Sequence, residues 1–423
     1  MLSRFAWISA GLLLTCAVVS AADWPQWRGP NRDEISQDKD LLTKFPPGGP
    51  KLLWSVKNAG VGYSGPAIVG DRLYSLGADE QANKEFVFAI DVKSGKEAWR
   101  TQIGAYKSTN YKDGWGGGPR CTPSVDGDLI FVLGVNSDLA CLDKSGKKLW
   151  AKNLIKEFGG QMMSDWGYAE SPLVDGDHLI CSPGGNGGTL AALDKKSGKL
   201  IWRSKDLKDG AAYSSIIAAD VEGVRQYIQL TGKGIAGVAA TDGQLLWSVE
   251  RPHRTATIPT AIYHDGYVYT TAGYGCGCAL IKLTKSGNSF KAEEVYANKN
   301  MTNHHGGVVL VDGHIYGFSE SGGWECQDFM SGKVVWDEKG KGRGKGSLTF
   351  ADGRLYCYTQ DDGILFCIDA SAAGFKETGR FSIPQQSKLR KPSGRIWTHP
   401  VIANGKLYLR DQELLFCYDI SAK

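Results

Sequence analysis

A short phrase built around a glycine and a tryptophan returns along the chain. Each of its tryptophans stands four residues after a glycine, and an aspartate usually precedes that glycine by three or four residues, as Asp91 precedes Gly95. An Asp side chain can bond a turn backbone, and Gly accepts the positive φ that a tight turn needs. The phrase therefore predicts two strands joined by a turn, with a large apolar ring packed between layers. The tryptophans are Trp99, Trp150, Trp202, Trp247 and Trp336.

A second phrase precedes the first and has the form of a β-hairpin: an apolar run, Asp-Gly or Gly-Asp, and another apolar run. It is clearest at residues 65–74, 122–131 and 171–180, and weaker copies start near 262, 309, 349 and 401. The most degraded copy, at 213–229, still leads to Gly243 and Trp247. Units of four antiparallel strands with a period of about fifty residues are typical of a β-propeller.

The two ends of the repeat region complement each other. The eighth unit stops at Asp419, one strand short, whereas Trp54 lies in an apolar run at 50–54 that has no unit before it. Pairing these segments would close a ring and remove an exposed sheet edge. The fifth and seventh units lack the tryptophan, so 293–296 and 379–382 are expected as their outer strands. The sequence predicts an all-β, eight-bladed propeller over 51–423 after an extension at 23–50, with seven blades as the alternative if the fourth unit is miscounted.

The first 22 residues have the pattern of a signal peptide. Arg4 precedes an apolar run from 8 to 19, and small residues at 20–22 predict cleavage near Ala22. Cys16 raises the alternative of lipidation, although Thr15 stands where a smaller residue is usual. No later stretch predicts a transmembrane span. We therefore expect a periplasmic or secreted protein, and a monomer.

Charge and cysteine usage narrow the function classes further. A formal net charge of +4 over 423 residues gives no reason to expect a nucleic-acid partner. Nine cysteines remain after residue 22, an odd number, and most lie in apolar runs, such as Cys141, Cys357, Cys367 and Cys417. The favoured interpretation is that they are small buried residues, with disulfides as the alternative that export permits.

The two phrases together resemble the pyrroloquinoline-quinone (PQQ) repeat family, and the resemblance covers nearly the whole chain after residue 22. The segment 23–30, Asp-Trp-Pro-Gln-Trp-Arg-Gly-Pro, also resembles the leader of exported bacterial propellers of this kind. The resemblance implies one of two functions. Some members are quinoprotein dehydrogenases with PQQ and calcium on the axis, and others are scaffolds, like the BamB propellers of outer-membrane assembly. The repeat itself is structural and does not choose between them.

Motifs for catalysis are missing from the sequence. It contains no Gly-x-Ser-x-Gly, no His-Glu-x-x-His and no Cys-x-x-Cys-His. The resemblance implies that a quinoprotein often carries two adjacent cysteines over its cofactor, and the nearest approach here is Cys276-Gly277-Cys278. We therefore expect no catalytic residues, no resident cofactor and no metal. A short quinoprotein dehydrogenase that uses PQQ and calcium is the alternative, and polysaccharide cleavage ranks third.

One set of polar residues stands out because its members come just before the innermost strand of a unit. Eight units around an axis would bring these positions into one ring, which could bind an anion or sugar hydroxyls. The competing interpretation is a water-filled channel whose polar groups satisfy one another. Glu170 could hold a cation or pair with Arg120, whereas adjacent histidines on a strand would face opposite sides and make a metal site improbable. The residues are Arg120, Glu170, Tyr213, His304, His305, Lys345 and His399.

Two longer connections interrupt the repeat. Residues 113–120 carry Trp115 and residues 161–168 carry Trp166, among glycines and methionines. Either both fold over the same mouth of the ring, or they fill gaps between blades. On these grounds we expect an exported, non-catalytic propeller that acts as a scaffold or binding module for a protein or carbohydrate partner.

Overall fold

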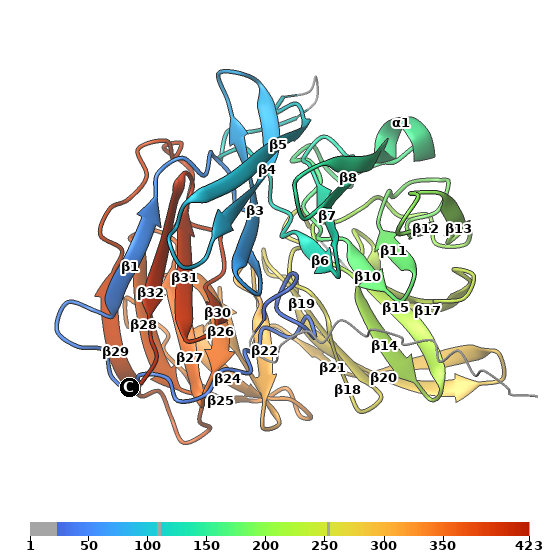
Figure 1. Ribbon diagram of the computed structural model, residues 1–423. Helices are drawn as coiled ribbons and strands as arrows, with labels where there is room; N and C mark the ends of the chain where they lie inside the picture. Colours follow the sequence, from blue (N-terminus) through green and yellow to red (C-terminus); the bar gives the residue numbers. More distant parts are fainter. Residues whose placement is uncertain (1–22, 108–110, 252–253, 423) are drawn as a thin grey trace, which may run out of the picture.

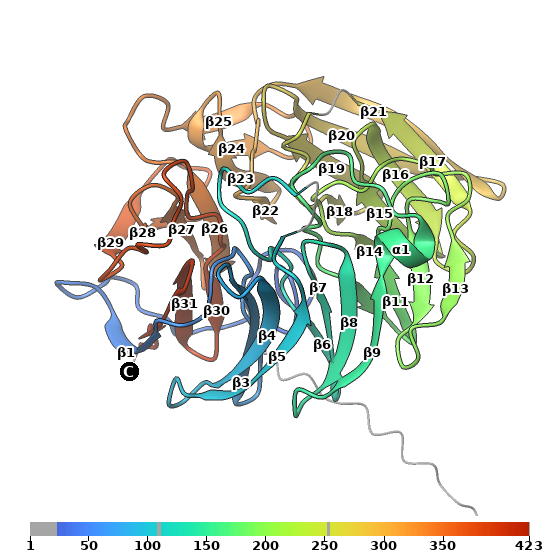
Figure 2. The same ribbon diagram turned by 90° about the horizontal axis from the view of Figure 1, so that it is seen from above.

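Small antiparallel sheets stand around one axis in the computed structural model, which describes residues 23–107, 111–251 and 254–422 (Figures 1 and 2). Within those residues there are eight sheets of four strands each, so the eight-bladed prediction is confirmed. The signal peptide and Cys16 lie outside the described residues. The innermost strands are β2 (Ala67–Val69), β6 (Ser124–Asp126), β10 (Leu173–Asp175), β14 (Ile217–Val221), β18 (Ile262–His264), β22 (Val308–Val311), β26 (Gly346–Ala351) and β30 (Val401–Ala403).

Each blade continues outward from its innermost strand in chain order. The second strands are β3 (Arg72–Asp79), β7 (Leu129–Leu133), β11 (His178–Cys181), β15 (Val224–Leu230), β19 (Tyr267–Ala272), β23 (His314–Ser319), β27 (Arg354–Thr359) and β31 (Lys406–Asp411). The third strands are β4 (Lys84–Asp91), β8 (Asp138–Asp143), β12 (Ala191–Asp194), β16 (Gly234–Ala239), β20 (Gly277–Ser286), β24 (Gly323–Asp328), β28 (Ile364–Asp369) and β32 (Leu414–Asp419).

The outer strands include both segments that were expected to replace a tryptophan strand. They are β5 (Glu97–Gly104), β9 (Lys148–Asn153), β13 (Leu200–Arg203), β17 (Leu245–Glu250), β21 (Ser289–Asn298), β25 (Val334–Asp337), β29 (Glu377–Ser382) and, in the last blade, β1 (Lys51–Val56). The described residues add one short helix, α1 (Leu154–Phe158), capped by Asn153. No described helix has the length and apolar character needed to cross a membrane.

The ring closes where the two ends of the repeat region meet. β1 pairs antiparallel with β32, and the pairing runs from Lys51 opposite Asp419 to Val56 opposite Leu415. Figure 1 shows the blue β1 beside the red β32. The predicted closure by pairing of the terminal strands is therefore confirmed, and β1 covers the edge that β32 would otherwise expose.

The hydrophobic core lies between neighbouring blades. One cluster, for example, joins Tyr74 and Leu76 of the first blade to Ile130 and Val132 of the second, all of them buried. Eight of the nine described cysteines are buried and all nine are free, which confirms their interpretation as small core residues. The core therefore holds each blade to the next, as a closed ring requires.

The repeated tryptophan fastens one blade to the next. The Trp99 indole donates from Nε1 to the Lys144 carbonyl of the following blade at 2.9 Å. A Cβ at Gly146 would lie 2.6 Å from that ring, and Gly146 has φ +85°, so this turn needs glycine for two reasons. Tyr296 takes this place in the fifth blade, where its hydroxyl donates to the Phe329 carbonyl at 2.8 Å. Trp247 differs, because its Nε1 bonds Gln226 within its own blade.

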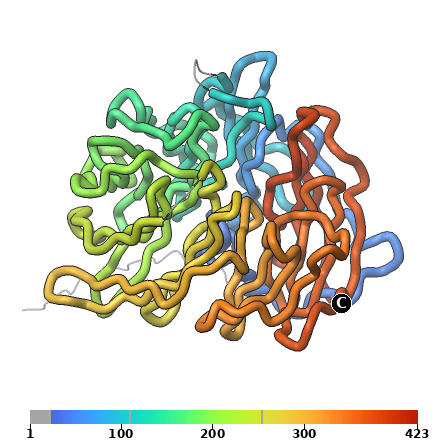
Figure 3. Tube along the Cα trace, turned by 180° about the vertical axis from the view of Figure 1, so that it is seen from behind, coloured from blue at the N-terminus to red at the C-terminus, as the bar shows by residue number. Residues whose placement is uncertain are grey.

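The segment after residue 22 passes through the middle of the ring (Figure 3). Trp24 bridges to Ile68 of the first blade, and Ile35 bridges to Phe350 of the seventh. Between them, Arg28 donates to the Val308 carbonyl at 2.5 Å, and Arg32 donates to the Ile216 carbonyl at 2.9 Å. We call residues 24–35 the axial plug. No feature of the sequence predicted that the extension would enter the middle of the ring.

Candidate functional site

A cavity of about 510 Å³ opens at one mouth of the ring. Its size is that of a small-molecule site, for which about 300–1000 Å³ is usual. Its walls combine aromatic rings with a few polar groups. The aromatic residues are Trp27, Tyr63, Trp115, Trp166, Tyr213, Tyr274 and Trp397, and the polar ones include Arg120, His304, His305, Glu320, Lys345 and His399.

The repeat explains why these residues meet. The chain approaches the innermost strand of each blade at the same mouth, so residues just before β6, β22, β26 and β30 share one space. Six of the seven residues of the predicted ring line the cavity, and Glu170 does not. In a ring of eight, the second and sixth blades face each other, which places Arg120 across the axis from His304 and His305 (Figure 2).

Arg120 forms one wall together with the two long connections. Its Nη1 donates to the Trp166 carbonyl at 2.9 Å, and its guanidinium lies 5.7 Å from the centre of the Tyr63 ring. Tyr63 in turn donates its hydroxyl proton to the Trp115 carbonyl at 3.1 Å. Trp115 and Trp166 both line the cavity. Of the two alternatives for these connections, folding over the same mouth is therefore the one observed.

The opposite wall holds a small polar cluster. Lys345 Nζ lies 3.0 Å from Glu320 Oε1 and 2.5 Å from His304 Nδ1. Burial, helped by the positive charge of Lys345, lowers the pKa of His304 to about 4. Burial also lowers the pKa of Lys345, although Glu320 opposes that shift. At neutral pH the cluster is a Lys–Glu pair beside a neutral imidazole.

His305 is buried, with 7% of its surface exposed, and neither ring nitrogen has a hydrogen-bond partner among the described residues. Burial, with the charges of its neighbours, lowers its pKa well below the usual value for histidine, so the ring is neutral at pH 7. A bend carries His304 and His305, and both line the cavity. The expectation that the two adjacent histidines face opposite sides was wrong, because they do not lie on a strand.

The axial plug supplies part of the cavity wall. The Trp27 ring lies 4.7 Å from the His399 ring, and its Nε1 donates to Thr260 Oγ1 at 2.9 Å. His399 Nδ1 lies 3.1 Å from Glu34 Oε2, and the same oxygen lies 3.0 Å from Arg28 Nε. Buried polar contacts therefore connect Arg28 and Glu34 of the plug to His399 in the cavity wall.

Glu170 is placed differently from the sequence expectation. It is 1% exposed, its Oε1 accepts the Ser182 backbone N–H, and burial raises its pKa to about 7 against the opposing effects of that hydrogen bond and of the Arg32 charge. No ion pair joins it to Arg120 within the described part of the chain. Its suggested role as a partner of Arg120 was therefore wrong: Arg120 turns to the Trp166 carbonyl, and Glu170 lies beneath the wall.

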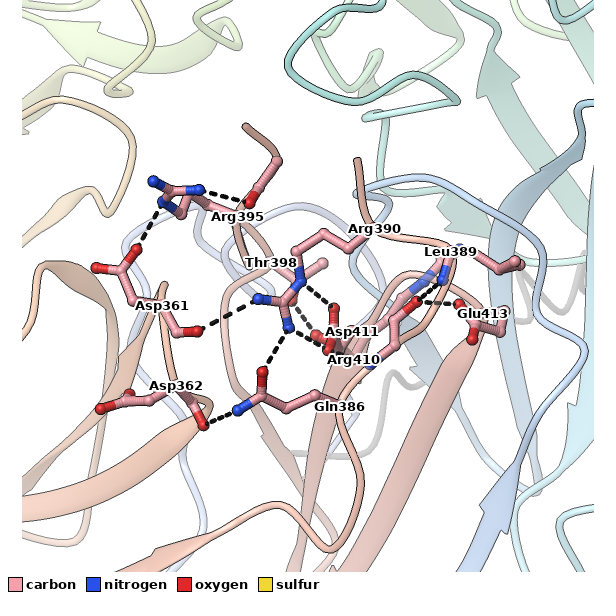
Figure 4. A network of polar contacts seen from close by, with 12 residues as sticks. Asp361, Asp362, Gln386, Leu389, Arg390, Arg395, Thr398, Arg410, Asp411 and Glu413 are labelled. Carbon is pink, nitrogen blue, oxygen red and sulfur yellow. Dashed lines mark hydrogen bonds and ion pairs between the residues drawn. The ribbon is translucent and has the colours of Figure 1, made fainter. Parts of the chain in front are cut away.

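Trp397 lies in the connection between the seventh and eighth blades, and Figure 4 shows the polar contacts of Arg390 and Arg395 in that connection. Arg390 in this connection pairs with the buried Asp411 at 2.5 Å and donates to the Asp361 carbonyl at 3.3 Å. Arg395 adds an ion pair with Asp361 at 2.6 Å. These contacts hold the connection over the mouth, with Trp397 turned to the cavity.

Sequence reasoning missed several lining residues. Trp27 comes from outside the repeat, and Trp397 stands directly before Thr398, at the approach to the innermost strand. Tyr274 and Glu320 lie on the turns between the second and third strands of the fifth and sixth blades. Those turns emerge at the same mouth as the approaches to the inner strands, because each second strand runs antiparallel to the first. The alternating direction of the strands in each unit could therefore have predicted Tyr274 and Glu320 at this mouth.

Comparison with known proteins identifies the family. The PQQ_2 family model, described as "Outer membrane protein assembly factor BamB", matches residues 83–338, which is more than half of the chain. The chain belongs to this family. Outer membrane protein assembly factor BamB of Burkholderia pseudomallei (strain K96243) is 22% identical over 394 residues, with 88% of each chain covered.

A second relative of this BamB-family chain carries the name of an enzyme. Lupanine 17-hydroxylase [cytochrome c] of a Pseudomonas species is 26% identical over 162 residues, covering 35% of this chain and 23% of the relative. Among solved structures, BamB from Moraxella catarrhalis superposes with a TM-score of 0.59 at 15% identity, over 88% of this chain and 98% of that one. Quinohemoprotein alcohol dehydrogenase from Comamonas testosteroni gives 0.50 at 12% identity, over 95% and 81%. These structural likenesses show the fold alone.

Proposed function

We propose that this BamB-family propeller is an exported, non-catalytic binding module of the cell envelope, and that its axial cavity takes a carbohydrate. The aromatic lining of the cavity carries the proposal. Four tryptophans and three tyrosines surround about 510 Å³ of space together with histidine, arginine and lysine side chains. A sugar ring packs its apolar face on aromatic rings and gives its hydroxyls to polar groups, and this lining offers both.

Two further points support a binding role in the envelope. The segment 1–22 has the pattern of a signal peptide, and the matching family model carries the name of an outer-membrane assembly factor. A protein partner on the outer face of the ring is the second candidate, favoured by the match to BamB of Burkholderia pseudomallei over 88% of both chains. The cavity favours the carbohydrate, because a pocket of this volume encloses a small ligand better than a protein surface.

A quinoprotein dehydrogenase is the competing enzyme class. Calcium takes six to eight oxygen ligands. Among the described residues, Glu320 is the one carboxylate in the lining, and Lys345 and the Tyr274 backbone N–H already bind its oxygens. Among the described residues no group of three His, Cys, Asp or Glu could hold a metal ion. Trp27 offers an aromatic floor, but no aspartate from the described part of the chain lines the cavity beside it. The residues present do not fit PQQ with calcium.

Titration calorimetry of the purified protein against soluble oligosaccharides tests the binding role, with tryptophan fluorescence as a second readout. Trp115 is 49% exposed, so Trp115→Ala should leave stability unchanged and weaken binding by about 0.5–1.5 kcal/mol. Leu149→Ala is the matched control, since Leu149 is 46% exposed on β9, away from the cavity. Absence of binding by every oligosaccharide would refute the carbohydrate role. Dye reduction with alcohols or aldoses after addition of PQQ and calcium would refute the non-catalytic role.

A further inference from the structure

Arg120 is a cation without an anion. Its guanidinium lines the cavity, and no carboxylate of the described residues lies within ion-pair distance of it. Its hydrogen bonds go to neutral acceptors: the Trp166 carbonyl at 2.9 Å, the Gly116 carbonyl at 3.4 Å and the Tyr111 hydroxyl at 3.5 Å. Two of the three are at the long limit for a hydrogen bond. A guanidinium has five N–H donors, so Arg120 keeps donor capacity for a ligand.

Three other cations around this mouth are paired. Lys345 meets Glu320 at 3.0 Å, Arg390 meets Asp411 at 2.5 Å, and Arg395 meets Asp361 at 2.6 Å. Since an arginine in a water-poor site gains most from a bidentate carboxylate or phosphate, the unpaired member of the group marks where an anion would be bound.

A second unsatisfied group lies across the axis. His305 is buried against the cavity with both ring nitrogens free of partners among the described residues. Its backbone carbonyl is already bound by His399 Nε2 at 3.0 Å, which fixes the segment while the ring stays available. A buried polar ring without a partner costs free energy, and a ligand hydroxyl would remove that cost.

We propose that the ligand of this cavity is an acidic sugar, a carbohydrate whose uronic acid carboxylate binds Arg120 while a hydroxyl bonds His305. This rests on the proposed carbohydrate-binding function and narrows its ligand class. Trp115 and Trp166 flank Arg120, and Trp397 lies 6.1 Å from His305 between ring centroids, so aromatic faces adjoin both polar ends. The ligand would span the axis between the second and sixth blades.

The test compares trigalacturonic acid with its fully methyl-esterified form, which carries no charge and adds one methyl group at each carboxyl. We expect wild-type protein to bind the acid at least tenfold more tightly than the ester in calorimetry, and expect this preference to shrink as sodium chloride is raised. Arg120→Gln should weaken binding of the acid by about ten- to hundredfold and leave the ester unchanged. Arg120→Lys should fall between, because it keeps the charge and loses the planar fork.

His305→Gln provides a separate readout, because it should weaken acid and ester alike. Arg100→Gln is the matched control, since Arg100 pairs with Glu97 at 2.7 Å on β5 and lies outside the lining. Equal affinity of wild-type protein for acid and ester would overturn the acidic-sugar inference and leave carbohydrate binding standing. Binding of neither, with no neutral oligosaccharide bound, would overturn both. If benzoate binds as tightly as trigalacturonic acid, the inference that the ligand is a sugar would be overturned, and the anion site at Arg120 would stand.

Discussion

A buried ion pair lies within the axial plug, and breaking it should destabilise the whole ring, because Arg28 also donates to the Val308 carbonyl of the sixth blade. Arg28 Nε lies 3.0 Å from Glu34 Oε2, with side chains 0% and 2% exposed. Arg28→Met keeps most of the side-chain volume and removes the charge, so Glu34 stays buried without its main partner. Leaving one charge of a buried pair unpaired costs about 3–5 kcal/mol.

That loss can be read as a melting temperature. Unfolding entropy is about 2.1 cal/mol/K per residue, so about 400 residues give roughly 0.85 kcal/mol/K. Arg28→Met should therefore lower Tm by about 4–6 °C in differential scanning calorimetry. Arg380→Met is the control, because Arg380, which pairs with Glu377 on β29, is 51% exposed, and an ion pair at the surface contributes about 0–1 kcal/mol.

The double variant Arg28→Met/Glu34→Gln separates the charge from the packing. Glutamine removes the stranded carboxylate, so the double variant should regain at least half of the lost Tm. If Arg28→Met melts within about 1 °C of Arg380→Met, the buried pair in the plug stabilises the fold no more than an exposed pair does, and the reasoning is refuted.

Three further predictions concern a buried carboxylate, the tryptophans between blades and the connection over the mouth. Burial raises the pKa of Glu325 to about 8, so folding favours its protonated form and the stability of the fold decreases as pH rises from about 4.5 through 8. Glu325→Gln should therefore raise the free energy of unfolding by about 2–4 kcal/mol at pH 9 and hardly change it at pH 4. An equal gain at both pH values would contradict this. Trp202 is 8% exposed and Trp150 is half-buried, so in chemical denaturation Trp202→Ala should cost about 3–5 kcal/mol and Trp150→Ala less; the reverse order would be inconsistent with the packing between blades. Arg390→Gln removes the 2.5 Å contact with the buried Asp411, so hydrogen exchange at 384–398 should accelerate while the blades stay protected; unchanged exchange would show that this pair does not hold the connection.

The fold could be predicted from the sequence because the residues that define it lie in one unit or in neighbouring units and recur along the chain. Gly146 and Trp99 stand in neighbouring units, and the same spacing recurs, so turn, outer strand and contact between blades could all be predicted. The replacement of tryptophan at Tyr296 was also within reach, since the outer strand was expected there. The closing pair of β1 and β32 followed from two incomplete ends that fit each other.

Only part of the candidate site could be predicted from the sequence, because the remaining part depends on contacts between segments that are far apart in the chain. The position before an innermost strand predicted Arg120, His305 and Lys345 in one cavity. Nothing local to Arg28 shows that it would reach a carbonyl 280 residues later, at Val308. Glu170 stands one position later in its unit than Arg120, since it aligns with the buried Cys121, and its side chain turns under the wall to the Ser182 backbone.

A crystal structure of the protein with bound trigalacturonic acid tests the central claim most directly, because the claim is that the closed ring gathers opposite blades into one ligand site. We predict sugar density inside the axial cavity, with a carboxylate on the Arg120 guanidinium and a hydroxyl on the His305 ring. Sugar bound on the outer strands instead, or the cavity filled by a quinone with a metal ion, would contradict it.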